Sequence, residues 1–164
     1  MLTAGSHIIV MGVAGCGKTT IGRLLAEELS LPFADGDDYH PDSNIKKMSE
    51  GTPLDDDDRW PWLDKLNAVL KGAGTSMVIS CSALREVYRQ RIGAGLHVTF
   101  IYLKISEKTV LERVRSRQHF FPESLVRTQF EVLEEPVGDS VIVANAEQAV
   151  PELLGDICRR LDPR

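Results

Sequence analysis

Gly12-Val13-Ala14-Gly15-Cys16-Gly17-Lys18-Thr19 is the stretch that decides the fold. It follows a short apolar run at 7–11, typical of a buried strand, and precedes a helical pattern at 21–29. The spacing G-x-x-x-x-G-K-[ST] in this context is typical of a phosphate-binding P-loop. A chance glycine-rich turn is the alternative, but the motif and both of its flanks fit. We therefore predict a nucleoside triphosphate site made of Gly12, Val13, Ala14, Gly15, Cys16, Gly17, Lys18, Thr19 and Thr20.

Each part of this motif has a physical role. The glycines let backbone N–H groups turn around a phosphate, and the helix that follows points the positive end of its dipole there. Lys18 is expected to reach the β- and γ-phosphates, Thr19 to offer its hydroxyl to Mg²⁺, and Thr20 to contact the α-phosphate. The predicted ligands are ATP and Mg²⁺.

The composition narrows the class of protein. A chain of 164 residues fits one domain, 1–164, and it has no apolar run near the roughly 18 residues of a membrane span. A net charge of −5 argues against a general nucleic-acid binder. The start of the chain lacks the pattern of a signal peptide, and three widely spaced cysteines predict reduced thiols. We expect a cytoplasmic protein that binds neither membranes nor nucleic acids.

Carboxylates follow the second predicted strand, at 31–34. In open α/β sheets ligands bind at the carboxyl ends of the strands, so Asp35 and Asp37 are expected to face the same crevice as the P-loop. Asp38 fits a solvated turn. Phosphoryl transfer needs a carboxylate near the acceptor hydroxyl, and Asp37 is the candidate.

The next segment is a polar insert that leads into an acidic helix start. A short helix is expected to begin near Pro41, and Asp55-Asp56-Asp57-Asp58-Arg59 opens a helix that ends near Gly72. The aspartates can simply cap that helix. Arg59 can either hold a substrate carboxylate in a bidentate pair or be neutralised by these aspartates.

Three more strands are predicted, at 77–81, 98–103 and 141–144. Ser82 is read as a cap for the helix through Val87 and Ile92, and Arg85 beside it as either a substrate contact or a solvated cation. Arg113 and Arg117, four residues apart on a helix, can act together on the γ-phosphate or complement the helix dipole. An aromatic turn and a helix at 123–133 follow, as in a closing lid.

Strands that alternate with helices behind a P-loop predict an α/β protein with a parallel sheet covered by helices on both faces. At this level the chain resembles the gluconokinases. The resemblance rests on Asp35-Gly36-Asp37, His40-Pro41, Asn44, Lys47-Met48, Gly51, Pro53-Leu54, Asp56-Asp57-Asp58-Arg59, Pro61-Trp62-Leu63, Cys81-Ser82-Ala83-Leu84-Arg85, Tyr88-Arg89, Phe100-Ile101-Tyr102-Leu103, His119-Phe120-Phe121, Gln129-Phe130 and Glu135-Pro136.

The resemblance implies a fold like that of the nucleoside-monophosphate kinases: a three-layer sandwich around a five-stranded sheet of order 2-3-1-4-5. It also implies a substrate-binding insert at about 38–62, a lid at about 115–130, and a homodimer. The implied reaction is ATP-dependent phosphorylation of D-gluconate at its primary hydroxyl, giving 6-phosphogluconate. Lys18, Asp37, Arg113 and Arg117 would act on the reacting groups, and the sugar acid would be held by Asp37, His40, Lys47, Arg59, Ser82, Arg85 and His119.

Two other classes of protein share parts of this pattern. A shikimate kinase has the same kind of fold, P-loop and paired aspartates, but the block from His40 to Trp62 argues against it. A nucleotide-dependent switch or a nucleic-acid-remodelling ATPase also needs a P-loop. The small size, the acidic charge and the predicted lid arginines argue against both.

Overall fold

The computed structural model describes residues 5–116 and 122–162. Its elements, in chain order, are β1 (Ser6–Met11), α1 (Lys18–Leu29), β2 (Phe33–Asp35), the short 3₁₀ helix η1 (Gly36–Tyr39), α2 (Asp42–Ser49), α3 (Asp56–Gly72), β3 (Val78–Ser80), α4 (Glu86–Gly93), β4 (His97–Lys104), α5 (Glu107–Ser116), α6 (Glu123–Val132), β5 (Val141–Asn145) and α7 (Val150–Leu161).

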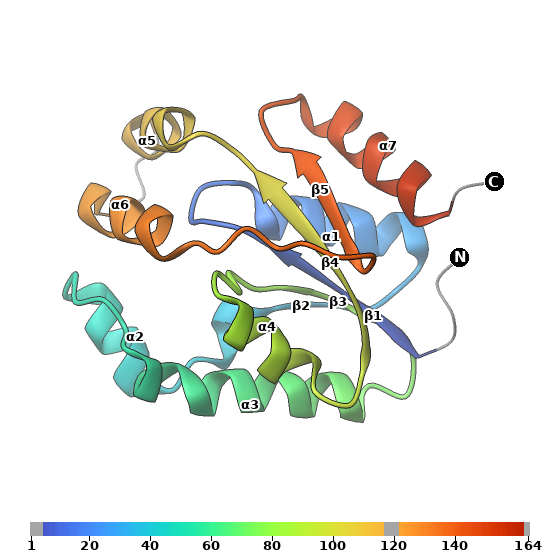
Figure 1. Ribbon diagram of the computed structural model, residues 1–164, viewed down its shortest axis with the longest axis horizontal. Coiled ribbons are helices and arrows are strands. Elements are labelled where there is room, and N and C mark those ends of the chain that lie inside the picture. The colour runs from blue at the N-terminus through green and yellow to red at the C-terminus, as the bar shows by residue number, and fades with distance from the viewer. Residues whose placement is uncertain (1–4, 117–121, 163–164) are drawn as a thin grey trace.

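The strands form one parallel sheet of order β2-β3-β1-β4-β5, which confirms the predicted fold class and strand order (Figure 1). β1 lies in the middle, between β3 and β4. The chain therefore leaves β1 at the point where the strand order reverses, and this is where open α/β sheets form a ligand crevice. The P-loop occupies that point.

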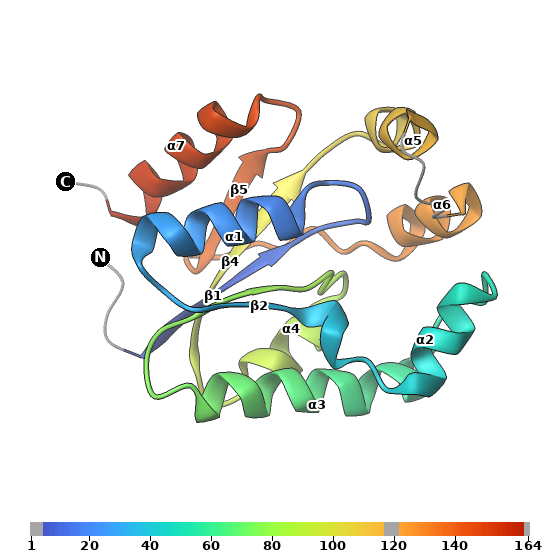
Figure 2. The ribbon, with the colours of Figure 1, turned by 180° about the vertical axis from the view of Figure 1, so that it is seen from behind.

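Side chains of β1 alternate between two cores. Ile8 and Val10 pack with residues of α1 and α7 on one face, and Ile9 and Met11 pack with residues of α3 and α4 on the other. All four are fully buried. Figure 2 shows α1 and α7 together on the near face of the sheet, with α3 below. The continuous apolar run of β1 thus reflects a strand covered on both sides.

The acidic segment before α3 is a helix cap, as expected. The Asp55 side chain accepts from the backbone N–H of Asp58, and the Asp58 side chain accepts from that of Asp55, which forms a capping box. The helix then buries Trp62, Leu63, Leu66 and Leu70 and ends at Gly72. This fixed start places Arg59 and Trp62 beside the carboxyl ends of the strands.

The prediction that Ser82 caps the following helix is wrong. α4 begins at Glu86, with Arg85 in the N-cap position. The backbone carbonyl of Ser82 instead accepts from the N–H of Gly12, and Ala83 adopts a left-handed conformation with φ of 45°. Because this loop is bound to the P-loop, the helix starts later than the sequence pattern indicated.

Among residues 5–116 and 122–162 we find no helix with both the length and the apolar character needed to cross a membrane.

Candidate active site

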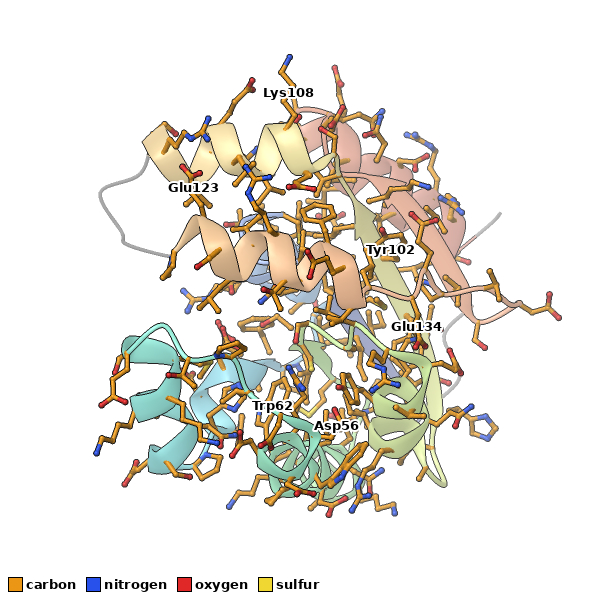
Figure 3. The ribbon with its side chains drawn as sticks, turned by 60° about the vertical axis from the view of Figure 1, so that its left-hand side comes forward. Asp56, Trp62, Tyr102, Lys108, Glu123 and Glu134 are labelled. Carbon is orange, nitrogen blue, oxygen red and sulfur yellow. The ribbon has the colours of Figure 1, made fainter. Side chains whose placement is uncertain are left out.

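A cavity of about 330 Å³ opens where the P-loop, η1, α3 and α6 meet. Figure 3 looks at this side of the molecule, where α6 lies across from α2 and from the start of α3, which carries the labelled Asp56 and Trp62. Many of the residues predicted for the site line this cavity: Ala14, Gly15, Gly17, Lys18, Thr19, Thr20, Asp37, His40, Arg59 and Ser82.

The P-loop has the backbone geometry that its glycines allow. Gly12 adopts φ of 145°, and a Cβ there would lie 2.8 Å from Sγ of Cys16 and 3.1 Å from the carbonyl oxygen of Leu103. Glycine is therefore required for the first turn of the loop. Lys18 donates from Nζ to the carbonyl oxygen of Val13 at 2.9 Å, so its ammonium group lies across the loop that is expected to hold phosphate.

Thr19 and Asp35 form a pair of oxygen donors beside this loop. Oγ1 of Thr19 donates to Oδ2 of Asp35 at 2.9 Å, and both residues line the cavity. A hydroxyl and a carboxylate oxygen suit Mg²⁺, which takes few protein ligands and completes its shell with phosphate and water. The sequence reading named Thr19 for the metal and placed Asp35 only in the crevice.

Asp37 lies on η1, and its carboxylate lines the cavity. The strand predicted at 31–34 is β2, which ends at Asp35, and Oδ1 of Asp35 accepts from the N–H of Asp37 at 3.0 Å. Desolvation within the crevice raises the pKa of Asp37, the Lys18 ammonium lowers it, and the Asp35 and Asp38 carboxylates raise it. Asp37 thus lines the same cavity as Lys18, whose charge acts on its carboxylate.

η1 can approach the sheet because it begins at Gly36. A Cβ on Gly36 would lie 2.3 Å from the carbonyl oxygen of Ser80, at the end of β3. The carbonyl oxygen of Gly36 accepts from Nε1 of Trp62 at 2.8 Å, which ties η1 to α3 as well. Together these contacts fix the turn that carries Asp37.

His40 is a buried member of the same wall. Its ring stacks on Trp62, with the ring centroids 4.0 Å apart, and its Nδ1 lies 3.2 Å from Nδ2 of Asn44. Burial, with a smaller contribution from the Arg59 cation, lowers the pKa of His40 to about 4. His40 is therefore neutral at physiological pH.

Arg59 and Arg85 share the carboxylate of Asp56. Arg59 lies 3.3 Å from Oδ1 of Asp56, Arg85 lies 3.1 Å from Oδ2, and the Tyr88 hydroxyl also donates to Asp56. The Tyr88 hydrogen bond, followed by the two arginine cations, lowers the pKa of Asp56. Arg85 also lies 3.3 Å from Oε1 of Glu134. This group of charges is called the Asp56 cluster below.

The two predicted arginines of the Asp56 cluster differ in the cavities that they line. Arg59 lines the main cavity and also a neighbouring pocket. Arg85 lines the neighbouring pocket, but it is not among the described residues that line the main cavity. Arg59 is thus paired with an aspartate and still lines the cavity, so its contact with a substrate carboxylate stays a prediction. Arg85 is not placed at the P-loop cavity.

Other predicted residues lie elsewhere. Lys47 pairs with Asp58, with Nζ 2.7 Å from Oδ2, and it is not among the described residues that line the cavity. Arg113 donates to the carbonyl oxygen of Ala146 at 3.0 Å, which directs its guanidinium toward the start of α7. Arg117 and His119 lie outside the described residues.

Gln129 and Ser80 are among the residues of the cavity wall that were missed as site residues. Oε1 of Gln129, on α6, accepts from the N–H of Ala14 in the P-loop at 2.7 Å. Ser80 ends β3 with a buried Oγ that has no hydrogen-bond partner among the described residues. Gln129 appeared in the sequence only as part of a family motif. Ser80 could have been found from its place at the carboxyl end of a central strand.

Comparisons with known proteins place this site in a family. The sequence model of the shikimate kinases matches residues 14–136. The thermosensitive gluconokinase of Escherichia coli K12 is 46% identical over 142 residues, covering 83% of this chain and 75% of that protein. This chain belongs to the gluconokinase family.

The solved structures agree with this family assignment. A gluconokinase from Sinorhizobium meliloti superposes with a TM-score of 0.83 at 39% identity, covering 96% of this chain and 95% of that one. The shikimate kinase of Aquifex aeolicus reaches a TM-score of 0.59 at 18% identity, covering 94% and 95%. The second likeness shows the fold alone, whereas the first extends the gluconokinase resemblance over nearly the whole chain.

Proposed function

We propose that this protein transfers the γ-phosphoryl group of ATP to the primary hydroxyl of D-gluconate, giving ADP and 6-phosphogluconate. The observation that carries the proposal is that a single cavity is lined by the P-loop lysine, by the Thr19–Asp35 pair and by Asp37. Such a cavity can hold a donor phosphate and an acceptor hydroxyl side by side. The family supplies the identity of the acceptor.

The P-loop and the oxygen pair suit a metal-bound triphosphate. Thr19 and Asp35 would hold Mg²⁺, directly or through its water ligands. When bound, Mg²⁺ would supply positive charge that offsets the charge of the phosphate oxygens. Phosphate oxygens would replace the Val13 carbonyl as the acceptor for Lys18, whose charge then balances that of the transferring group.

Asp37 is the proposed base. Its carboxylate would accept the proton of the acceptor hydroxyl as the new O–P bond forms and the bond to the ADP oxygen breaks. Arg113 would act on the γ-phosphate only after leaving the Ala146 carbonyl, and Arg117 remains a proposal from the sequence alone.

Arg59 is the proposed partner of the gluconate carboxylate. It is the arginine of the Asp56 cluster that reaches the main cavity, and a guanidinium can bind a carboxylate through two parallel hydrogen bonds. Asp56 pairs with it, which limits the positions it can adopt.

We also propose that the protein works in the cytoplasm. ATP as the phosphoryl donor suits that compartment, and so do the cysteines at positions 16, 81 and 158, which form no disulfide.

The experiment is an acceptor screen with the purified protein. ADP release from MgATP is measured in the presence of gluconate, other aldonates, glucose or shikimate. We expect release that depends on gluconate and is much weaker with the neutral sugar. Shikimate is included because a shikimate kinase model matches the chain. ADP release that depends on shikimate and not on gluconate would overturn the proposal.

A further inference from the structure

A row of polar groups runs from the start of α3 through Asn44 and His40 toward Asp37. Asn44 lies on α2 and is 1% exposed, so its side chain bonds only inside the protein. Its Nδ2 is 2.9 Å from the backbone carbonyl oxygen of Asp58. A carbonyl oxygen can only accept a hydrogen bond, so the group facing it must be the NH₂ of the amide. The orientation of the Asn44 amide is thereby fixed.

The same NH₂ group decides the tautomer of His40. Nδ2 of Asn44 also lies 3.2 Å from Nδ1 of His40, and it can only donate there. Nδ1 is therefore the unprotonated nitrogen of the ring. Because burial keeps His40 neutral, its single proton lies on Nε2.

The protonated nitrogen faces the proposed base. Nε2 of His40 lies 4.0 Å from Oδ1 of Asp37, a separation longer than a hydrogen bond. The imidazole is held in place by its stack on Trp62, whereas the Asp37 side chain is 75% exposed and can rotate. A small rotation of the carboxylate closes the gap to a fixed donor.

We propose that His40 is a positioning residue for Asp37. Its Nε2–H holds one carboxylate oxygen, so that the other oxygen faces the acceptor hydroxyl, and Asn44 keeps the imidazole in the tautomer that can do this. The inference rests on the proposed function, since it assigns the orientation of the proposed base. It replaces the expected contact between His40 and the sugar with an action through Asp37.

The other charges around Asp37 do not supply such a donor from this side. Lys18 lies on α1 and attracts the carboxylate toward the phosphate site, while Asp35 and Asp38 repel it. Arg59 adds a positive charge near His40. Lys18 donates to the Val13 carbonyl and Arg59 to Asp56, so their charges act on Asp37 without a hydrogen bond, whereas the Nε2–H would bond one oxygen. Only a directed donor fixes which oxygen faces the acceptor.

The tautomer is measured directly by ¹⁵N nuclear magnetic resonance of the imidazole nitrogens, with the full chain free of ligands. The chain has four histidines, and the signals of His40 are identified because they are absent from the variant His40→Phe. We expect His40 to be neutral at pH 7 with its proton on Nε2. A proton on Nδ1, or an imidazolium at that pH, would overturn the inference. The readout needs no substrate, so it is independent of the proposed function.

Kinetics then separate positioning from sugar binding. His40→Phe keeps a ring to stack on Trp62 but loses the donor, and we expect kcat to fall at least about fivefold while the KM for gluconate changes less than about twofold. His40→Gln, which can donate from its amide, should recover part of the loss. A raised KM with unchanged kcat would make His40 a sugar contact and contradict the inference.

A double variant tests whether the effect passes through Asp37. If His40 acts only on that carboxylate, then adding His40→Phe to Asp37→Asn should lower kcat no further. A full additional loss would contradict the inference.

Asn44→Leu tests the role of the amide. Asn44 is not among the described residues that line the cavity, so this variant should shift the His40 signals and also lower kcat. A wild-type protein without gluconate-dependent ADP release would overturn the proposed function and leave the tautomer measurement standing.

Discussion

Asp37 is the proposed general base of the reaction. Asp37→Asn keeps the shape of the side chain but cannot take up a proton, so we expect kcat to fall about a hundredfold or more, the scale of a lost general base. The KM for ATP should stay nearly constant. Steady-state ADP release measures both. Asp38→Asn is the matched control, because Asp38 is the neighbouring exposed carboxylate and is not among the described residues that line the cavity. Equal losses in the two variants would remove Asp37 from the reaction.

Arg59 tests whether the acceptor carries a carboxylate. Arg59→Lys keeps the charge but loses the paired hydrogen bonds, so the KM for gluconate should rise at least about tenfold, or roughly 1.4 kcal/mol, with little change in the KM for ATP. Calorimetric binding of gluconate checks the affinity directly. Arg91→Lys is the control, since Arg91 pairs with Asp64 on the surface. An unchanged affinity for gluconate would leave Arg59 as a partner of Asp56 alone.

His40 should make stability depend on pH. Its pKa in the folded protein is about 4, below the ordinary 6.5, so the unfolded chain binds a proton first as the pH falls. The wild type should therefore lose, relative to His40→Phe, on the order of 3 kcal/mol of unfolding free energy between pH 7 and pH 4. Urea unfolding at several pH values measures this difference. The same pH dependence of the unfolding free energy in the wild type and in His40→Phe would contradict this prediction.

Single residues were predictable from the sequence where their chemistry depends on near neighbours. The P-loop and the Asp35–Asp37 turn are such cases. Arg85 was not, because its partner Asp56 lies 29 residues earlier and no local pattern signals that contact. Lys47 was assigned to the substrate from the family resemblance, and no local pattern signals its pairing with Asp58, which depends on how α2 packs beside α3.

At the scale of elements, α6 is joined to the P-loop by one hydrogen bond. Gln129→Leu removes the acceptor for the Ala14 N–H and leaves that group without its partner, at a cost of about 1 kcal/mol. We expect the KM for ATP to rise about fivefold, because the loop is then less ordered before phosphate binds. Gln90→Leu, at an exposed position of α4, is the matched control. If nucleotide titrations give both variants the wild-type affinity for ATP, α6 has no part in shaping the P-loop.

The helices and strands themselves were largely predictable, and the errors have local causes. The pattern of α3 gave both of its ends, because a run of aspartates marks its start and the expected end near Gly72 is observed. The start of α4 was placed too early because Ser82 looks like a cap, while its backbone is bound to Gly12. The second strand was predicted at 31–34 and is observed at Phe33–Asp35, since η1 begins at Gly36.

At the scale of the whole molecule, the parallel sheet followed from strands that alternate with helices behind a P-loop, whereas the order of its strands was implied by the resemblance to the gluconokinases. The cavity could not be predicted in the same way. Its wall joins residues of α6 to the P-loop across 115 positions of the sequence, and its floor depends on the contact between Gly36 and the end of β3. The predicted homodimer and the single domain remain predictions.

The central claim is phosphoryl transfer to the primary hydroxyl of gluconate, and the product itself tests it most directly. Purified protein, MgATP and gluconate are incubated, and the proton-coupled ³¹P spectrum is recorded. A phosphate ester at the primary position is coupled to two protons on its carbon, so we predict a new triplet that grows with ADP and is absent with Lys18→Ala. A doublet from a secondary ester, or ADP formed without any new ester, would contradict the account.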